Sequence, residues 1–272
     1  MAKMTGWKKP DSMSIVFVLL GALILLFIFA PPLKTVFSSS PGTLWNTLLQ
    51  EDVYSSILLT LSAALIATLI GLFLGVPLAY LLARRQFQGK KFVEAIIDVP
   101  IVIPHSAAGV ALLFVFGSNF LLGKVLHSIG IGFFGAFTGV VIAMMFVSVP
   151  FLIDSAKEGF KAIDVRLEKV ARTLGASAWK SFFRISLPLA WRSIFSGSVL
   201  MWARGLSEFG AIVIIAYSAS FFGWNTKVLP VLVADRFDFG LDYTRPVAAL
   251  AILISLIAFI VLRSMAYRGE KA

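Results

Sequence analysis

Two ionisable residues, Arg204 and Glu208, lie inside a stretch of sequence that is otherwise almost free of charge. The segment 189–217 is apolar apart from these two residues and Arg192 near its start. If a helix begins near Leu189, Arg204 lies about 22 Å along it at 1.5 Å per residue, close to the middle of a bilayer. An ionisable group is costly at that depth and is by default a functional-site hypothesis. Residues four apart pair on a helix, so the two side chains either lock the helices together, contact an anion directly, or hold a gate that rearranges.

A second candidate site begins where Pro100 and Pro104 interrupt another apolar stretch, with His105 and Ser106 directly after them. Each proline removes a backbone donor and bends a helix. Irregular backbone inside a membrane is tolerated only where it faces protein or a water-lined cavity. The freed amides, with His105 and Ser106, are therefore candidates for lining the path of an anion. The alternative is a bend that only shapes the bundle, with His105 bonded to a neighbouring carbonyl, and for His105 this structural role is favoured over a ligand role.

A third candidate is a charged, amphipathic segment at residues 157–188, between two apolar stretches. One face of a short helix there carries apolar residues at i, i+3, i+4 and i+7: Leu167, Val170, Ala171 and Leu174. Gly175 predicts the end of that helix. Ser177 suits the N-cap of a second short helix, with Ala178, Phe182 and Ile185 on its apolar face. This pattern predicts a docking surface for a protein partner.

The elements that must position these residues are long apolar helices. Hydrophobic residues make up 59% and charged residues 14% of the chain, whereas a soluble domain has about 25% charged residues. A membrane span needs about 20 mostly apolar residues. The charge-free runs are 12–33, 53–83, 99–123, 125–153 and 246–262, and 189–217 supplies a sixth span. We therefore predict an all-α polytopic membrane protein with six transmembrane helices in a single domain, residues 1–272, and exclude a soluble class.

The run 53–83 exceeds one bilayer thickness, so it must tilt, kink near Pro77 or project from the membrane. Small residues recur along it every four positions, at Ala67, Gly71, Gly75, Ala79 and Ala83. Such a stripe allows another helix backbone to approach closely. The neighbour is either in the same chain or in a second copy.

The net charge of +10 is explained by topology. Seventeen Lys and Arg residues lie before the first span, at 84–91, at 157–184 and after the last span, against five in the opposite loops. This asymmetry places both termini and the amphipathic segment in the cytoplasm. Because topology accounts for the excess of basic residues, the net charge does not indicate a nucleic-acid partner.

The residues for enzymatic chemistry are few. The chain has no cysteine, only two histidines and no metal-ligand spacing, so we expect no metal site and no catalysis. An ion-coupled secondary transporter is a competing class, but many such proteins have inverted repeats and several intramembrane charges. No clear repeat occurs here, and only Arg204 and Glu208 lie deep.

The spacing in the amphipathic segment matches a known pattern. The permeases of ATP-binding-cassette (ABC) importers carry a cytoplasmic loop of the form E-A-A-x-x-x-G-x9-I-x-L-P. This chain has Ala171, Gly175 and, after nine intervening residues, Ile185-Ser186-Leu187-Pro188. It departs at Lys169 and Val170, which replace Glu and Ala, although Glu168 stands one position earlier. Both replacements are compatible with a helix, so the departure puts a specific glutamate contact in doubt rather than the helix.

Longer motifs make the resemblance more specific. The stretches DVPIVIPH (98–105), FVSVPFLIDSAKEGF (146–160), DVRLEKVARTLGAS (164–177), LPLAWR (187–192) and WARGLSEFGAIVIIAY (202–217) resemble the permease subunit of molybdate/tungstate importers, especially the archaeal-type branch. The likeness runs from about Tyr54 to Arg263. Sulfate and thiosulfate permeases are the nearest relatives with similar motifs and remain the alternative. The chain departs at 218–230, where the family usually continues with Tyr-Pro and a further proline.

The resemblance implies a type I importer permease fold with a coupling helix, inside a coupling loop at about residues 157–187. Two copies of the chain would form the pore in the cell membrane. A separate ATPase subunit would bind ATP and Mg, and an extracytoplasmic binding protein would deliver the oxyanion; no cofactor is expected in this chain. No G-x-x-x-x-G-K-[ST] phosphate loop occurs in it. The residues expected to dock the ATPase are Leu167, Glu168, Val170, Ala171, Arg172, Leu174, Gly175 and Ala176. Those expected at the pathway or gate are Pro100, Pro104, His105, Ser106, Arg204 and Glu208.

Overall fold

The computed structural model describes residues 11–268, with side chains to residue 264. The basic residues Lys3, Lys8, Lys9 and Lys271, which contribute to the predicted orientation, lie outside this range. Four of the described helices are long and apolar enough to cross a membrane: α1 (Ser12–Phe37), α3 (Glu51–Arg84), α7 (Phe137–Lys161) and α13 (Leu241–Arg268). A bent pair, α4 (Lys90–Val102) and α5 (His105–Phe116), supplies a fifth span if the two are counted together. The polytopic prediction is confirmed.

The predicted count of six spans is not fully matched, and the difference lies in α10 (Leu187–Leu206). This helix stands in place of the predicted segment 189–217, but it does not qualify as a span by length and composition. It ends at Leu206, with Ser207 at its C-cap, and the chain continues as the short helix α11 (Gly210–Ile215). The single predicted helix is therefore two helices, and Glu208 lies in the break between them.

A second difference concerns the predicted span 125–153. Its first residues belong to a separate short helix, α6 (Leu121–Ser128), which already begins within the predicted span 99–123, and α7 begins only at Phe137 and runs to Lys161. Between them Gly130 and Gly135 have positive φ angles of 86° and 62°, a conformation that glycine adopts readily. Absence of charge does not distinguish a helix from a glycine-rich loop, which explains the misplaced boundary.

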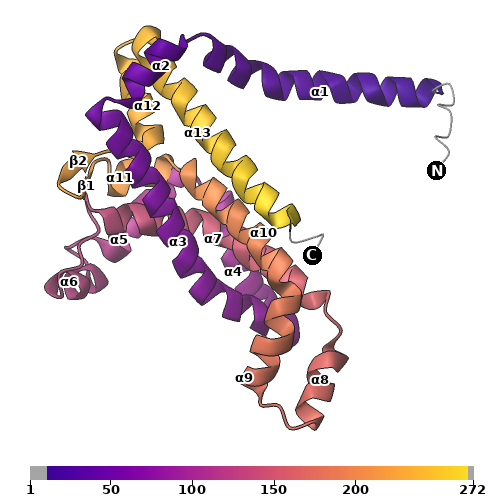
Figure 1. Cartoon of the computed structure of the whole chain (residues 1–272). Coiled ribbons are helices and arrows are strands. Elements are labelled where there is room, and N and C mark those ends of the chain that lie inside the picture. Colours follow the sequence, from indigo (N-terminus) through magenta and orange to yellow (C-terminus); the bar gives the residue numbers. More distant parts are fainter. Residues whose placement is uncertain (1–10, 269–272) are drawn as a thin grey trace.

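The core of the bundle forms where α3, α7 and α10 pack together (Figure 1). The stripe of small residues on α3 is part of this contact. A Cβ at Gly71 would fall 2.5 Å from Met201 Cε of α10, and one at Gly75 would fall 3.1 Å from Ile153 Cγ1 of α7. The neighbours of the stripe are therefore helices of the same chain, a choice that the sequence left open. The helix itself is continuous through Pro77 and about 51 Å long at 1.5 Å per residue.

The first helix lies apart from this core. Figure 1 shows α1 extending away from the bundle, and its contact is with α13. No residue of α1 is buried, which suits an apolar helix surrounded by lipid. Asp11 caps its start by accepting a hydrogen bond from the Ser14 amide at 2.9 Å. The chain then enters α2 (Pro41–Leu48), which is capped by Ser40 and has proline at its first position.

The two ends of the molecule carry different elements (Figure 1). At one end lie α8 (Val165–Thr173), α9 (Ala178–Ser181) and a π-helical turn, η1 (Phe182–Ser186), that leads into α10. Toward the other end lie α12 (Leu229–Asp238) and an antiparallel hairpin of β1 (Ala219–Phe221) and β2 (Trp224–Thr226). Its turn residues, Phe222 and Gly223, both have positive φ, as a tight two-residue hairpin turn requires. This hairpin occupies the stretch where the sequence departs from the expected family pattern.

Candidate functional site

The predicted docking helix is present as α8, and both of its ends are held by local hydrogen bonds. The Asp164 side chain accepts from the Arg166 amide at 2.9 Å. At the other end, Gly175 has a φ of +88°, its amide donates to Arg172 O at 3.1 Å, and the Ala176 amide donates to Ala171 O at 3.0 Å. These two bonds form a Schellman motif, which requires a left-handed residue at the position of Gly175. Gly175 therefore ends the helix as predicted.

The apolar face of α8 points away from the bundle. Leu167 and Val170 are exposed, and Leu174 is 83% exposed. Arg172 and Gly175 are also exposed, while Ala171 and Ala176 are half-buried. An apolar face left open beyond the bundle is a surface that a protein partner can cover.

Glu168 differs from the other residues predicted to dock a partner, because its carboxylate faces the bundle. Arg84 Nε donates to Glu168 Oε1 at 2.7 Å, and Ser186 Oγ donates to the same oxygen at 2.8 Å. Tyr80 OH donates to Oε2 at 2.9 Å. Burial opposes the ionisation of this carboxyl, but the three hydrogen bonds outweigh it and hold the pKa of Glu168 below its ordinary value. Glu168 therefore does not lie on the open face of α8 with Leu167, Val170 and Leu174.

The membrane-embedded candidates form a cluster around Glu208, whose side chain is 1% exposed. Arg204 Nη2 donates to Glu208 Oε2 at 3.1 Å and lies 2.8 Å from His105 Nε2. His105 Nδ1 lies 3.2 Å from the same carboxylate oxygen. Arg204 Nη1 also donates to Ser207 Oγ at 3.2 Å. The structure therefore joins His105 to the predicted Arg204–Glu208 pair, instead of bonding it to a backbone carbonyl.

The break between α10 and α11 places Glu208 in this cluster. Glu208 Oε1 accepts a hydrogen bond from the Ala211 amide at 2.8 Å, so the carboxylate also satisfies the start of α11. α5 and α11 approach closely because each helix has a glycine at the contact between them. A Cβ at Gly109 would fall 2.7 Å from Ala211 O, and one at Gly210 would fall 2.7 Å from His105 Cβ.

The predicted bend before His105 is present and large. The chain bends by 116° between α4 and α5, with Pro104 at the N-cap of α5. Pro100 is buried inside α4, which continues through it. Ser106 is exposed, whereas the imidazole of His105 contacts the Arg204 guanidinium. The bend thus positions His105, while Pro100 and Ser106 lie apart from the charged groups.

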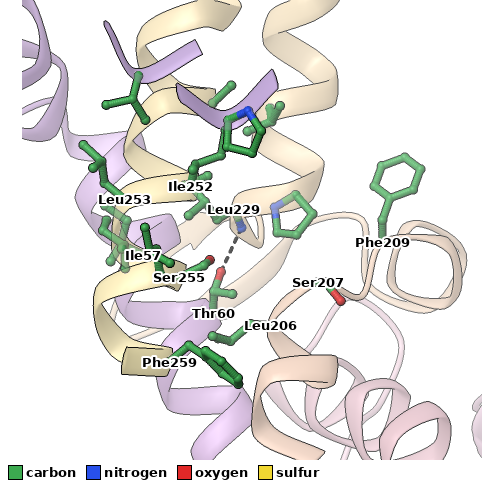
Figure 2. A pocket seen from close by; sticks show the side chains of 18 of the residues that line it. Ile57, Thr60, Leu206, Ser207, Phe209, Leu229, Ile252, Leu253, Ser255 and Phe259 are labelled. Atoms are coloured by element: carbon green, nitrogen blue, oxygen red, sulfur yellow. Dashed lines mark hydrogen bonds between the residues drawn. The ribbon is translucent and has the colours of Figure 1, made fainter. Parts of the chain in front are cut away.

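A cavity of about 1290 Å³ opens between α1, α3, α12 and α13, beside the end of α10. Its lining is almost entirely apolar, as Figure 2 shows for Ile57, Ile252 and Phe259. The Thr60 hydroxyl on its wall is already bonded, because it accepts from the Leu229 amide at 2.8 Å. Such walls suit hydrocarbon and offer little to a charged oxyanion, so this cavity is not a candidate anion site.

Sequence reasoning missed the partners of Glu168 and a polar cluster near the hairpin. In the sequence Arg84 is one of the basic residues that indicate topology, and Tyr80 and Ser186 carry no signal because they are far from Glu168 along the chain. Near the hairpin, Lys227 Nζ donates to Tyr217 OH at 3.0 Å and pairs with Asp235. Only the three-dimensional arrangement brings these groups together.

Comparison with known proteins agrees with this geometry. Residues 71–269 match the family model described as "Binding-protein-dependent transport system inner membrane component". A molybdate/tungstate transport system permease protein of Pyrococcus furiosus is 42% identical over 97% of this chain and 99% of its own length. A protein of the same description from Methanocaldococcus jannaschii is 42% identical over 89% and 92% of the two chains.

The solved structures add the fold. A chain in the crystal structure of a bacterial alginate ABC transporter, in complex with a pentasaccharide-bound periplasmic protein, superposes with a TM-score of 0.72. It covers 95% of each chain at 18% identity. The chain thus has the type I ABC importer permease fold and is a multi-pass membrane protein. It belongs to the family of binding-protein-dependent transport system inner membrane components.

Proposed function

We propose that this chain is the membrane-spanning subunit of an ABC importer that translocates molybdate or tungstate. The observation that carries the proposal is the nearly full-length likeness to archaeal molybdate/tungstate permease proteins. The motifs around His105 and Arg204, which first suggested this branch, contain the residues that meet in the charged cluster.

A separate ATPase subunit would supply the energy, with ATP and Mg bound there. The open apolar face of α8 supports this division of labour, since it offers that subunit a docking surface. A binding protein would deliver the oxyanion outside, and a second copy of the chain would complete the pore. Closure of the ATPase pair would move the docked α8 helices together and open the membrane helices outward as rigid bodies.

The proposed orientation puts both termini, α8 and α9 on the cytoplasmic side. Its support is the distribution of Lys and Arg, which concentrate beside α8 and at the end of α3. The hairpin and α12 would then face outside, toward the binding protein.

The charged cluster would act as a gate. Its Arg204 guanidinium is held by Glu208 and His105 in this structure. A pair that only locks the bundle would keep these contacts through the cycle, whereas a gate would exchange them as α10 and α5 move. An oxyanion passing nearby would compete with Glu208 for the guanidinium.

The test is reconstitution with the ATPase subunit and the binding protein, followed by ATP hydrolysis assays with tungstate, molybdate, sulfate and thiosulfate. Stimulation by tungstate or molybdate with sulfate inert is expected. Stimulation by sulfate alone would move the chain to the sulfate branch while leaving the coupling mechanism in place. Indifference to every oxyanion would reject the ligand class.

A further inference from the structure

The coupling helix α8 touches the bundle through very few of its own side chains. Within Val165–Thr173, Glu168 alone is buried and Ala171 is half-buried, while every other residue is exposed. The buried group is a carboxylate, not an apolar side chain. The attachment of α8 therefore depends on what that carboxylate binds.

Its three donors come from two different elements. Tyr80 and Arg84 lie one turn apart on α3 and reach both carboxylate oxygens, at 2.9 and 2.7 Å. Ser186, which is fully buried, donates from the π-helical turn that begins α10, at 2.8 Å. Glu168 thus joins α8 to the end of α3 and to the start of α10. Those two helices in turn belong to the packed core with α7.

The ion pair is buried on both sides. The Arg84 side chain is 8% exposed and that of Glu168 is 11% exposed. Arg84 Nη2 is buried and has no hydrogen-bond partner among the described residues. Loss of the carboxylate would leave a buried guanidinium poorly compensated, which is the strongly destabilising way to break such a pair. A carboxylate that docked a partner directly would be exposed, which Glu168 is not.

We propose that Glu168 is a positioning residue that clamps α8 to α3 and to the start of α10. A displacement of α8 then carries these two membrane helices with it as one body. This inference rests on the proposed docking role of α8. The partner would act on the exposed apolar face of α8. The contacts of Glu168 would then determine how the displacement of α8 is passed to α3 and α10.

The first test of the clamp measures the distance between α8 and α3 and does not depend on transport activity. The chain has no cysteine, so spin labels can be attached at Arg166→Cys on α8 and Phe73→Cys on the exposed side of α3. In the full-length chain in lipid nanodiscs, the distance distribution between the labels is expected to be narrow. Glu168→Ala should broaden it, and the exchange Arg84→Glu with Glu168→Arg should narrow it again. Glu51→Ala, an exposed carboxylate in the first turn of α3, is the matched control and should leave it unchanged.

An unchanged distribution in Glu168→Ala would overturn the clamp. Should that variant fail to insert, Glu168→Gln serves, because it removes the charge and keeps one oxygen acceptor, for either Tyr80 or Ser186. It should broaden the distribution to a smaller extent. If Glu168→Gln leaves the distribution unchanged, packing rather than the ion pair holds α8.

A second measurement separates this inference from the proposed function. In the complex with the ATPase and binding protein, Glu168→Ala should retain the ATPase subunit but lose most of the stimulation by loaded binding protein. Leu174→Asp, on the open face, should instead release the ATPase subunit. Retention and full stimulation in Leu174→Asp would reject the docking role of α8, whereas the label distances would still decide the clamp. Full stimulation in Glu168→Ala would reject the clamp's part in coupling.

Discussion

Gly210 lies so close to His105 that a Cβ at its position would stand 2.7 Å from the Cβ of His105. The contact joins α11 to α5, and it brings the imidazole next to Glu208 across the break between α10 and α11. A glycine at 210 therefore sets the geometry of the charged cluster, although it has no functional group of its own.

Replacing Gly210 with alanine should push α5 and α11 apart and lengthen the contact between His105 and Glu208. Overpacking of this kind costs about 1–3 kcal/mol, so the thermal unfolding temperature of the purified protein should fall and oxyanion uptake should decline. Gly21→Ala is the control, because a Cβ there meets nothing within 4 Å. Equal unfolding temperatures for the two variants would show that α5 and α11 are not tightly packed.

Glu208→Ala tests whether the charged cluster is a gate, as proposed. It leaves Arg204 without its buried partner and removes the acceptor for the Ala211 amide, and breaking a buried pair on one side costs about 3–5 kcal/mol. We expect passive leakage of oxyanion from proteoliposomes in the absence of ATP. Exchange of the two residues, Arg204→Glu with Glu208→Arg, should reduce that leakage. If proteoliposomes with Glu208→Ala do not leak oxyanion, the cluster stabilises the bundle without acting as a gate.

Gly175→Glu should uncouple ATP hydrolysis from uptake while the protein still inserts. The residue has a φ of +88°, so any side chain strains the end of α8, and a bulky acidic one also enters the docking face. Gly130→Glu is a suitable control, because Gly130 has a similar φ of +86° and equally open surroundings but lies far from α8 in sequence. For both variants, oxyanion uptake and ATP hydrolysis are measured in the same vesicles. Normal uptake by Gly175→Glu would contradict the docking assignment.

The clamp on α8 should be insensitive to pH across the neutral range. The folded pKa of Glu168 is lowered, so its contribution is present above the unfolded value of about 4.3 and is lost as pH falls through the folded value. Burial and the neighbouring Glu168 carboxylate raise the pKa of Tyr80 above its ordinary value, so its phenol stays neutral over this range. The label distance between α8 and α3 should therefore be the same at pH 7 and pH 5. Broadening already at pH 6 would assign the attachment to another group.

The sequence predicted α8 almost to the residue, because helix periodicity and the Gly175 stop are local signals. It also paired Arg204 with Glu208, since four-residue spacing needs no tertiary information. The sequence does not reveal the break after Leu206, because apolar residues continue beyond it, and the hydrogen bond from the Ala211 amide to Glu208 at the start of α11 is seen only in the structure. His105 contacts Arg204, which lies 99 positions away, and Arg84 contacts Glu168, which lies 84 positions away. Helix periodicity predicts no contact at such separations.

The most direct test of the central claim is accumulation of tungstate in proteoliposomes that contain this chain, its ATPase subunit and ATP, with loaded binding protein outside. We predict accumulation that stops when ATP is omitted and does not respond to an imposed proton or sodium gradient. Accumulation driven by such a gradient without ATP would contradict the account and place the chain among ion-coupled transporters.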